Sequence, residues 1–206
     1  LVADIAAETG RRAIAVGADV SVEEDCRSLF TTAIDAMGRV DCLVNNAGIG
    51  PGYGPFAEVS VADIEVTWAV NLTGPFVCAR EAVRHMSTAR GGAGGSIVNV
   101  SSRAAVIGSP FEWIHYAASK AGLDTLTTGL SKEVAAEGIR VNTVRPGLMT
   151  TDFGPWSPPG RTERLKAGVP LGRGGEPHEI AAAIVWLASD DASYVTGAFI
   201  DVGGGR

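Results

Sequence analysis

The sequence predicts a three-layer α/β/α fold built around a parallel sheet. Short apolar runs alternate along the chain with helical patterns of ten or more residues. Connections of that length join parallel strands through right-handed crossovers, which place helices on both faces of the sheet. Ligands of such sheets bind beyond the carboxyl ends of the strands. We therefore expect the functional residues to follow the predicted strands.

Five runs are predicted to be strands. The run SIVNVS at residues 96–101 is apolar enough to be buried on both faces, as the central strands of a parallel sheet are. The other four runs cover residues 12–16, 40–45, 140–144 and 198–202.

Helices are predicted between these runs. Residues 1–9 resemble the end of a helix capped by Gly10, so the chain begins inside an element. Ser21, followed by Glu24, has the pattern of a capping box and predicts a helix that ends at Gly38.

Three later helical patterns cover residues 60–88, residues 115–138 and the segment opened by Glu176-Pro177. Pro75 should kink the first of them unless residues 71–74 already break the helix.

Length and composition are those of one globular domain over residues 1–206, with 46% hydrophobic and 19% charged residues. The net charge is −6 and the 17 basic residues are scattered, which argues against a nucleic-acid partner. No apolar run reaches the roughly 18 residues of a membrane span, and no signal pattern opens the chain. These features predict a cytoplasmic protein with no membrane partner.

The three cysteines, Cys26, Cys42 and Cys78, lie far apart in the sequence within apolar segments. They lack the CxxC spacing of metal and redox sites. We expect them to be buried small side chains in a reducing compartment, and we expect no metal site.

Tyr116 and Lys120 form the central pair of candidate catalytic residues. Four positions apart on a predicted helix, their side chains emerge on one face, one turn from each other. A tyrosine has a pKa of about 10, so proton exchange near neutral pH needs a lower value, and a nearby ammonium has the right sign to lower it. This spacing is weak evidence alone, because it also occurs on ordinary exposed helices.

Other polar residues lie where strands or helices end. Ser101-Ser102 follow the 96–101 run, and a hydroxyl there either points into the ligand crevice or only caps a turn. Residues 45–48, Asn-Asn-Ala-Gly, allow a flat ligand to approach the backbone, or form a simple turn. Asn71 is a poor helix former that either repairs a helix break or holds a water molecule.

Over its whole length the chain resembles the short-chain dehydrogenase/reductase family, whose fold is of the Rossmann type. The resemblance rests on five ordered blocks: Asp19-Val20, Asn45 to Gly48, Asn71 within VNLTG, Ser102 with YAASK at 116–120, and Pro146-Gly147 with Thr151. The stretches VSSRAAVIGSP and YVTGAFIDVGGGR are similar to a bacterial subgroup labelled glucose 1-dehydrogenase-like.

The resemblance implies an NAD- or NADP-dependent oxidoreductase that transfers a hydride between nicotinamide and an alcohol or carbonyl substrate such as a sugar, polyol or small ketone. Tyr116 is the implied general acid/base, Lys120 lowers its pKa and binds the nicotinamide ribose, Ser102 binds the substrate oxygen, and Asn71 anchors a relay water. The implied cofactor-binding residues are Asp19 and Val20 at the adenine, Asn45, Ala47 and Gly48 along the ribose and phosphates, and Pro146, Gly147, Met149 and Thr151 near the carboxamide. A homotetramer formed through the long helices and the last strand is also implied.

Two features depart from the family pattern. The first strand, the glycine-rich turn and the second strand of the family should precede Leu1, so we expect the first βαβ unit to be missing from these residues. Ser102 and Tyr116 are 14 positions apart, one more than expected, which reshapes the substrate pocket. The choice between NAD and NADP stays open, because the selecting residues belong to the missing unit.

Several further residues are expected to be structural or to line the crevice. His115 is expected at the pocket rim or in a cap, His85 and His178 in solvent, and Trp186 in the core with Leu187. Trp113 and Trp156 lie in loops that flank the crevice, and the sequence leaves open whether they contact the substrate. The loop 152–168, rich in Pro and Gly, is expected to be irregular until about Arg161 and to act as a mobile lid.

An alternative function belongs to another class. A catalytically silent dinucleotide-sensing or scaffold protein would keep this fold without turnover. A protein without catalysis has no physical need for Asn71, Ser102, Tyr116 and Lys120 together, which favours the enzyme.

Overall fold

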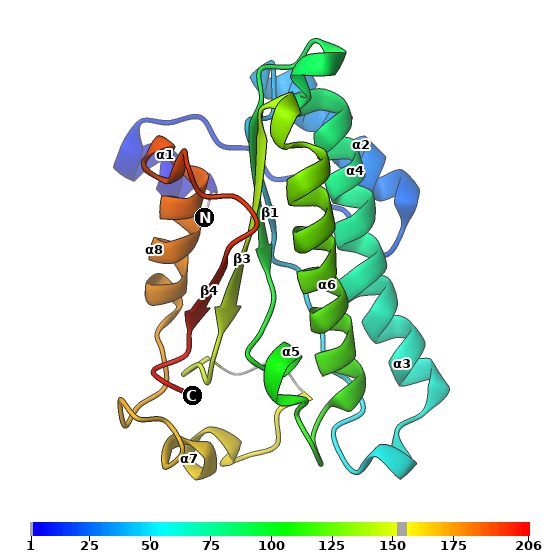
Figure 1. Ribbon diagram of the computed structural model, residues 1–206, viewed down its shortest axis with the longest axis vertical. Coiled ribbons are helices and arrows are strands. Elements are labelled where there is room, and N and C mark those ends of the chain that lie inside the picture. The colour runs from blue at the N-terminus through cyan, green and yellow to red at the C-terminus, as the bar shows by residue number, and fades with distance from the viewer. Residues whose placement is uncertain (1, 152–155) are drawn as a thin grey trace.

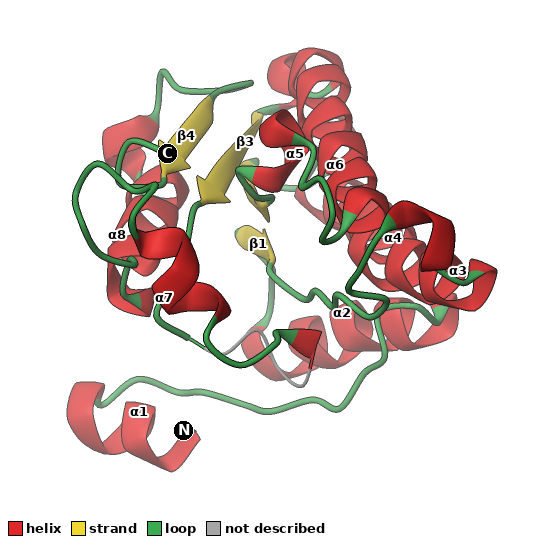
Figure 2. Cartoon of the chain, turned by 90° about the horizontal axis from the view of Figure 1, so that it is seen from below, coloured by secondary structure: helices red, strands yellow, loops and turns green. Residues whose placement is uncertain are grey.

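The computed structural model describes residues 2–151 and 156–206 and contains a four-stranded parallel sheet. Its strands are β1 (Cys42–Asn45), β2 (Gly95–Val100), β3 (Ile139–Pro146) and β4 (Phe199–Val202), and they lie side by side in that order. Helices cover both faces, as Figures 1 and 2 show. The predicted α/β class and parallel pairing are confirmed.

The helices divide between the two faces of the sheet. The helices α4 (Gly74–Met86) and α6 (Ile114–Glu133) pack against one face, with α2 (Glu23–Met37) beside α4, whereas α8 (Pro177–Ala188) packs against the other (Figure 2). The remaining α-helices are α1 (Val2–Thr9), α3 (Val61–Trp68), α5 (Ala104–Ile107) and α7 (Arg161–Lys166).

Two hydrophobic clusters fill the spaces between the layers. Consecutive residues of a strand point to opposite faces, so Ile97 of β2 packs under α4 whereas Val98 packs under α8 with Leu187. Both strand residues are fully buried. The prediction that this strand is buried on both faces is therefore confirmed.

The predicted long helix over residues 60–88 is interrupted. It consists of α3, a π-helical turn at Ala69–Thr73 and α4, so the irregular turn overlaps the expected break at residues 71–73, and Pro75 lies in the first turn of α4. Proline is tolerated there because the first helical N–H groups have no partner within the helix. π-turns of this kind often occur at functional sites, and this one contains Asn71.

Two local predictions near the N-terminal end are wrong. Residues 12–16 form no strand, because no described strand lies beside them to complete a hydrogen-bonded ladder, and Ile14 is left 37% exposed. The capping box of Ser21 and Glu24 is absent, because Val22 is the N-cap and the Ser21 hydroxyl donates instead to Asp19.

Two burial predictions are also wrong. Cys26 and Cys78 are buried, but Cys42 is exposed because β1 is the edge strand of the described sheet. Trp186 is 40% exposed rather than in the core, since its neighbour Leu187 occupies the face of α8 that meets the sheet. Among the described residues, no helix has the length and apolarity needed to cross a membrane.

Gly74 provides a test of the packing between α4 and the segment before α2. A Cβ atom there would lie 2.7 Å from the carbonyl oxygen of Val20, whereas a Cβ at Gly129 of α6 would meet nothing within 4 Å. We expect Gly74→Ala to lower the free energy of unfolding by about 1–3 kcal/mol through overpacking. Gly129→Ala, the matched control, should raise it by up to about 1 kcal/mol through helix propensity. Urea denaturation measures both, and equal effects of the two variants would contradict this packing.

Candidate active site

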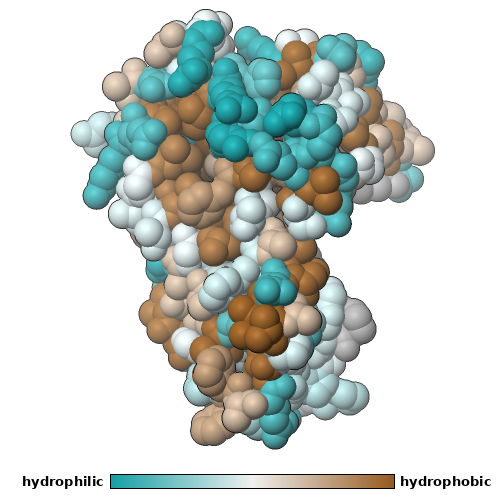
Figure 3. Space-filling view, turned by 90° about the vertical axis from the view of Figure 1, so that its right-hand side faces the viewer, coloured by the Kyte–Doolittle hydropathy of each residue, from teal (hydrophilic) through white to brown (hydrophobic). Residues whose placement is uncertain are grey.

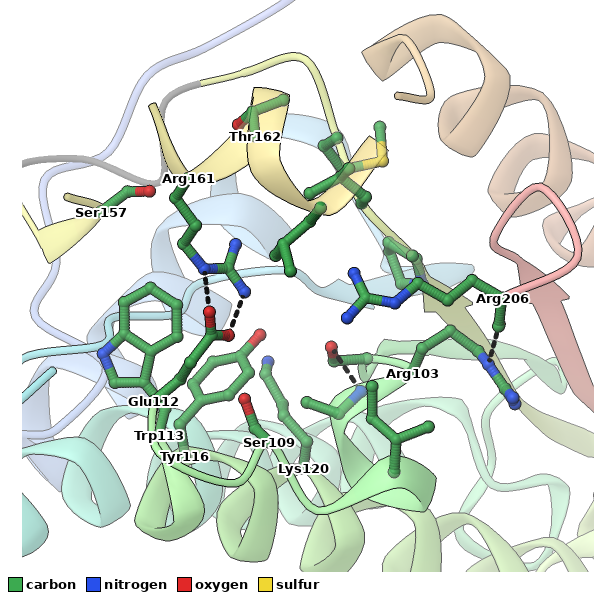
Figure 4. Close-up of a pocket in the computed structure, with 18 of the residues that line it drawn as sticks. Arg103, Ser109, Glu112, Trp113, Tyr116, Lys120, Ser157, Arg161, Thr162 and Arg206 are labelled. Atoms are coloured by element: carbon green, nitrogen blue, oxygen red, sulfur yellow. Dashed lines mark hydrogen bonds and ion pairs between the residues drawn. The ribbon is translucent and has the colours of Figure 1, made fainter. Parts of the chain in front are cut away.

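A cavity of about 530 Å³ opens at the carboxyl ends of the strands. Its wall combines residues that follow β1, β2 and β3 with residues from the start of α6 and from α7. This is the location expected for ligands of an open parallel sheet. The site-forming side chains are drawn in Figure 4.

Tyr116 and Lys120 enter the cavity from the first two turns of α6. Their i, i+4 spacing brings the Lys120 Nζ atom to 5.7 Å from the centre of the Tyr116 ring. Figure 4 shows the Tyr116 hydroxyl and the Lys120 ammonium pointing into the same space. The helical face predicted from the sequence is therefore present.

Ser102 lies in the cavity wall beside Tyr116, two residues after the end of β2. Its Oγ atom accepts a hydrogen bond of 3.1 Å from the Ala104 N–H, which fixes the side chain at the start of α5. Ser102 also hydrogen-bonds the Tyr116 side chain. The cavity thus brings together two hydroxyl groups and one ammonium from separate elements.

Burial dominates the proton affinity of Tyr116. It raises the pKa of this phenol to about 12, against the opposing effects of the Ser102 hydrogen bond and the Arg161 charge. These two groups, rather than Lys120, act to lower the pKa of Tyr116. Tyr116 is therefore a neutral hydroxyl, ready to donate a proton, throughout the physiological pH range.

Lys120 is only 3% exposed. Its Nζ atom donates a 2.9 Å hydrogen bond to the carbonyl oxygen of Val100, and its own carbonyl accepts one of 3.1 Å from Ser101 Oγ. Burial lowers the pKa of Lys120 to about 8, although the Asp124 carboxylate acts in the opposite direction. The ammonium is costly to bury, so its retention at this point is consistent with a functional role.

Asn71 is fully buried behind the cavity rather than in its wall. Its side-chain amide makes two hydrogen bonds of 2.8 Å with the backbone of Ile49, one accepted and one donated. A Cβ atom at Gly48 would lie 3.4 Å from Lys120 Nζ and 3.6 Å from Asn71 Oδ1. Asn71 therefore holds the loop after β1 close to Lys120.

The residues implied to bind cofactor fall into two groups. Gly48, Pro146, Gly147, Met149 and Thr151 line the cavity beside Tyr116 and Lys120. The size of the cavity fits a flat ring with its ribose. Gly147 lacks a side chain because Gly203 packs against it, 2.5 Å from where a Cβ would lie.

The second group, Asp19, Val20, Asn45 and Ala47, lies outside the cavity wall. The Asp19 carboxylate accepts from Ser21, and the Val20 carbonyl accepts from Cys26 Sγ. The Asn45 amide donates to Asn99 within the protein. These residues shape the ends of β1 and of the segment before α2.

An ion pair that the sequence did not reveal closes one side of the cavity. Arg161 of α7 donates to both carboxylate oxygens of Glu112, at 3.0 and 2.5 Å, and its guanidinium carbon lies 4.7 Å from the Trp113 ring centre (Figure 4). The Arg164 side chain donates to the Tyr53 hydroxyl. Arg161 and Glu112 are 49 positions apart, and no local pattern links them.

The remaining aromatic and histidine residues have different environments. Trp113 lines the cavity and Trp156 does not. His115 is 2% exposed, and its Nε2 atom lies 2.8 Å from the Pro51 carbonyl oxygen, so it is a buried residue rather than a pocket-rim one. His85 and His178 are exposed, as expected.

The predicted lid lies partly outside the described residues, at positions 152–155. Beyond them, the chain is irregular up to α7, which begins at Arg161 as expected. Lid motion remains a prediction.

Comparison with known proteins places this site in a family. The family profile described as enoyl-(acyl carrier protein) reductase matches residues 1–206. The uncharacterized oxidoreductase YgfF of Escherichia coli K12 is 48% identical over 206 residues, covering 100% of this chain and 83% of the relative. Glucose 1-dehydrogenase 2 of Bacillus subtilis is 37% identical over 204 residues, covering 98% and 78%.

A crystal structure described as a short-chain alcohol dehydrogenase from Sinorhizobium meliloti 1021 superposes with a TM-score of 0.89 at 38% identity, covering 99% of this chain and 79% of the other. The chain belongs to the short-chain dehydrogenase/reductase family and is an oxidoreductase. The resemblance seen in the sequence is thereby confirmed.

The buried ammonium predicts a pH-dependent stability. The folded-state pKa of Lys120 is about 8 against the ordinary lysine value of 10.5, so the unfolded chain binds more protons between these values. This group therefore destabilises the fold below pH 8, by about 3 kcal/mol from the shift alone, and the penalty disappears as the pH rises to about 10.5.

The test compares wild type with Lys120→Met by urea denaturation from pH 7 to 10. The free energy of unfolding of wild type should increase relative to that of the variant as the pH rises. A difference that is constant over this range would contradict the depressed pKa.

Proposed function

We propose that this protein is an NAD- or NADP-dependent oxidoreductase that interconverts an alcohol and its carbonyl compound, with Tyr116 as the general acid/base. The observation that supports this most directly is the convergence of Ser102, Tyr116 and Lys120 in one cavity at the strand ends. Hydride transfer to a carbonyl leaves negative charge on its oxygen, and two hydroxyl donors beside an ammonium stabilise that charge.

A bound nicotinamide would supply the hydride, two electrons and one proton, to the carbonyl carbon. Gly48, Pro146, Gly147, Met149 and Thr151 would hold its ring end, and Lys120 would bind its ribose. Ser102 would orient the substrate oxygen by a hydrogen bond. Tyr116 would give its hydroxyl proton to that oxygen as the alcohol forms, and would take the proton back in the oxidation direction.

Asn71 supports this site without lining the cavity. By resemblance it anchors a water that returns a proton to the centre, and its two hydrogen bonds with Ile49 also fix the loop that contains Gly48. By the same resemblance Asp19, Val20, Asn45 and Ala47 serve the adenine, ribose and phosphate end of the cofactor. A sugar, polyol or small ketone is the proposed substrate.

We also propose that the protein is cytoplasmic and forms a homotetramer, in which each subunit is a single domain. The buried free thiols of Cys26 and Cys78 fit a reducing compartment. The side of the molecule with α2, α3 and α4 exposes apolar residues, including Val61 and Phe76, and Figure 3 shows hydrophobic surface on this side. Such exposed patches are typical of subunit contacts.

Replacement of Tyr116 tests the proposed chemistry. Tyr116→Phe removes the proton donor but little of the cofactor surface, so NAD(P)H-dependent reduction of a carbonyl panel should fall about 10²–10⁴-fold. The dissociation constants for NADH and NADPH should change less than threefold, which corresponds to about 0.6 kcal/mol of binding free energy.

Tyr194→Phe is the matched control, because Tyr194 is fully exposed, and it should retain wild-type turnover. Near-normal turnover by Tyr116→Phe would refute the assignment. A wild-type protein that binds dinucleotide without turning over any carbonyl would favour the silent sensing or scaffold function instead.

A further inference from the structure

The cavity is strongly cationic in a protein of net charge −6. Among the residues that the structure describes, its charged lining consists of one carboxylate, Glu112, and five basic side chains: Arg103, Lys120, Arg161, Arg164 and Arg206. A concave site lined by one sign of charge raises the local concentration of ligands of the opposite sign. The charge of this cavity therefore favours an anion.

Most of these basic groups already have a partner. Arg161 pairs with Glu112 in a two-pronged contact, Arg103 pairs with Asp201 beyond the cavity, and Lys120 donates to the Val100 carbonyl. Within residues 2–151 and 156–206, no carboxylate forms an ion pair with the Arg206 guanidinium. Its charge is thus available to a ligand.

The glycine run at positions 203–205 determines where Arg206 lies. Gly204 and Gly205 have φ angles of +62° and +91°, and a Cβ atom at either would lie within 2.9 Å of Val169 or Pro170. Only glycine fits both the backbone conformation and the space. The run turns the chain sharply after β4 and directs Arg206 back towards the cavity.

Arg103 fixes the end of this turn. Its Nε atom donates a 2.8 Å hydrogen bond to the Arg206 carbonyl, while its other end pairs with Asp201. Figure 4 shows the Arg206 guanidinium pointing into the cavity, on the side opposite Trp113 and Glu112, with the Tyr116 hydroxyl and Lys120 ammonium between them. Arg103 is therefore a positioning residue for Arg206.

We infer that the substrate carries a carboxylate, which the Arg206 guanidinium binds while Tyr116 and Ser102 act on a carbonyl or hydroxyl group elsewhere in the same molecule. This inference rests on the proposed function and names its substrate class as hydroxy acids and the corresponding oxo acids. The planar fork of arginine matches a carboxylate with two parallel hydrogen bonds. A single guanidinium also balances the single charge of a carboxylate.

The cofactor offers a second source of negative charge, its phosphates, so the test must separate the two. We would measure reduction of 4-oxopentanoate, 5-oxohexanoate and 4-oxocyclohexanecarboxylate, each beside its methyl ester, which has the same skeleton without the charge. The variants are Arg206→Gln, Arg206→Lys and the charge-matched control Arg27→Gln, from the exposed surface of α2.

Wild type should prefer at least one acid over its ester by about 10- to 100-fold in kcat/KM, the range of a hydrogen bond to a charged group. This ratio should fall to near one in Arg206→Gln, recover in part in Arg206→Lys, and stay at the wild-type value in Arg27→Gln. An unchanged ratio in Arg206→Gln would overturn the inference. The inference would also be overturned if Arg206→Gln weakened the binding of NADPH instead of lowering the preference for the acid.

Binding is also measured without turnover, through the tryptophan fluorescence of the protein, of which Trp113 in the cavity wall is one of four sources. Quenching by 4-oxopentanoate that is stronger than quenching by its ester, and that depends on Arg206, supports the anion site even if no compound is reduced. Failure to reduce any compound would then count against the proposed function alone. Equal quenching by acid and ester would overturn the anion site.

Discussion

The attachment of α6 to the end of β2 is the constraint on which the site depends. Two hydrogen bonds make it: Lys120 Nζ to the Val100 carbonyl at 2.9 Å, and Ser101 Oγ to the Lys120 carbonyl at 3.1 Å. They place the second turn of the helix directly over the strand end. Ser102, the next residue along the chain, consequently faces Tyr116, one turn back along the helix.

A chain of buried polar side chains extends this constraint across the sheet. The Asn45 amide donates to Asn99, Asn99 donates to Thr127 of α6, and the Thr127 hydroxyl bonds Thr143 of β3. Each of these groups is buried and satisfied, so the network favours one register between three strands and the helix. The loop after β1, with Gly48, is held separately, by the hydrogen bonds between Asn71 and the Ile49 backbone.

The fold was predictable from the sequence wherever the pattern is local. The apolar run of β2, the helix opened by Glu176-Pro177 and the break near Asn71 all have signals within a few residues. The strand expected at 12–16 fails because a strand also requires a neighbour, which a local pattern does not contain. The capping box at Ser21 fails for a related reason, since Asp19 competes for the serine hydroxyl.

The site was predictable in part. Tyr116 and Lys120 share a helix, so their spacing indicates their common face. Ser102 could be placed because strand ends of a parallel sheet meet at one edge. Glu112 with Arg161, and Arg103 with Arg206, come together only through tertiary structure, over 49 and 103 positions. The glycine run at 203–205 was visible in the sequence, but its role depends on the close approach of Val169 and Pro170.

The central claim is that this cavity transfers a hydride to a carbonyl carbon while Tyr116 supplies the proton. The direct measurement is the position of the label after reduction of a ketone with dinucleotide deuterated at the transferring carbon, in ordinary water, by proton NMR and mass spectrometry. The account predicts one deuterium on the carbinol carbon, a hydroxyl proton from solvent, and one equivalent of oxidised dinucleotide. Product without deuterium on that carbon, or dinucleotide that is not consumed, would contradict it.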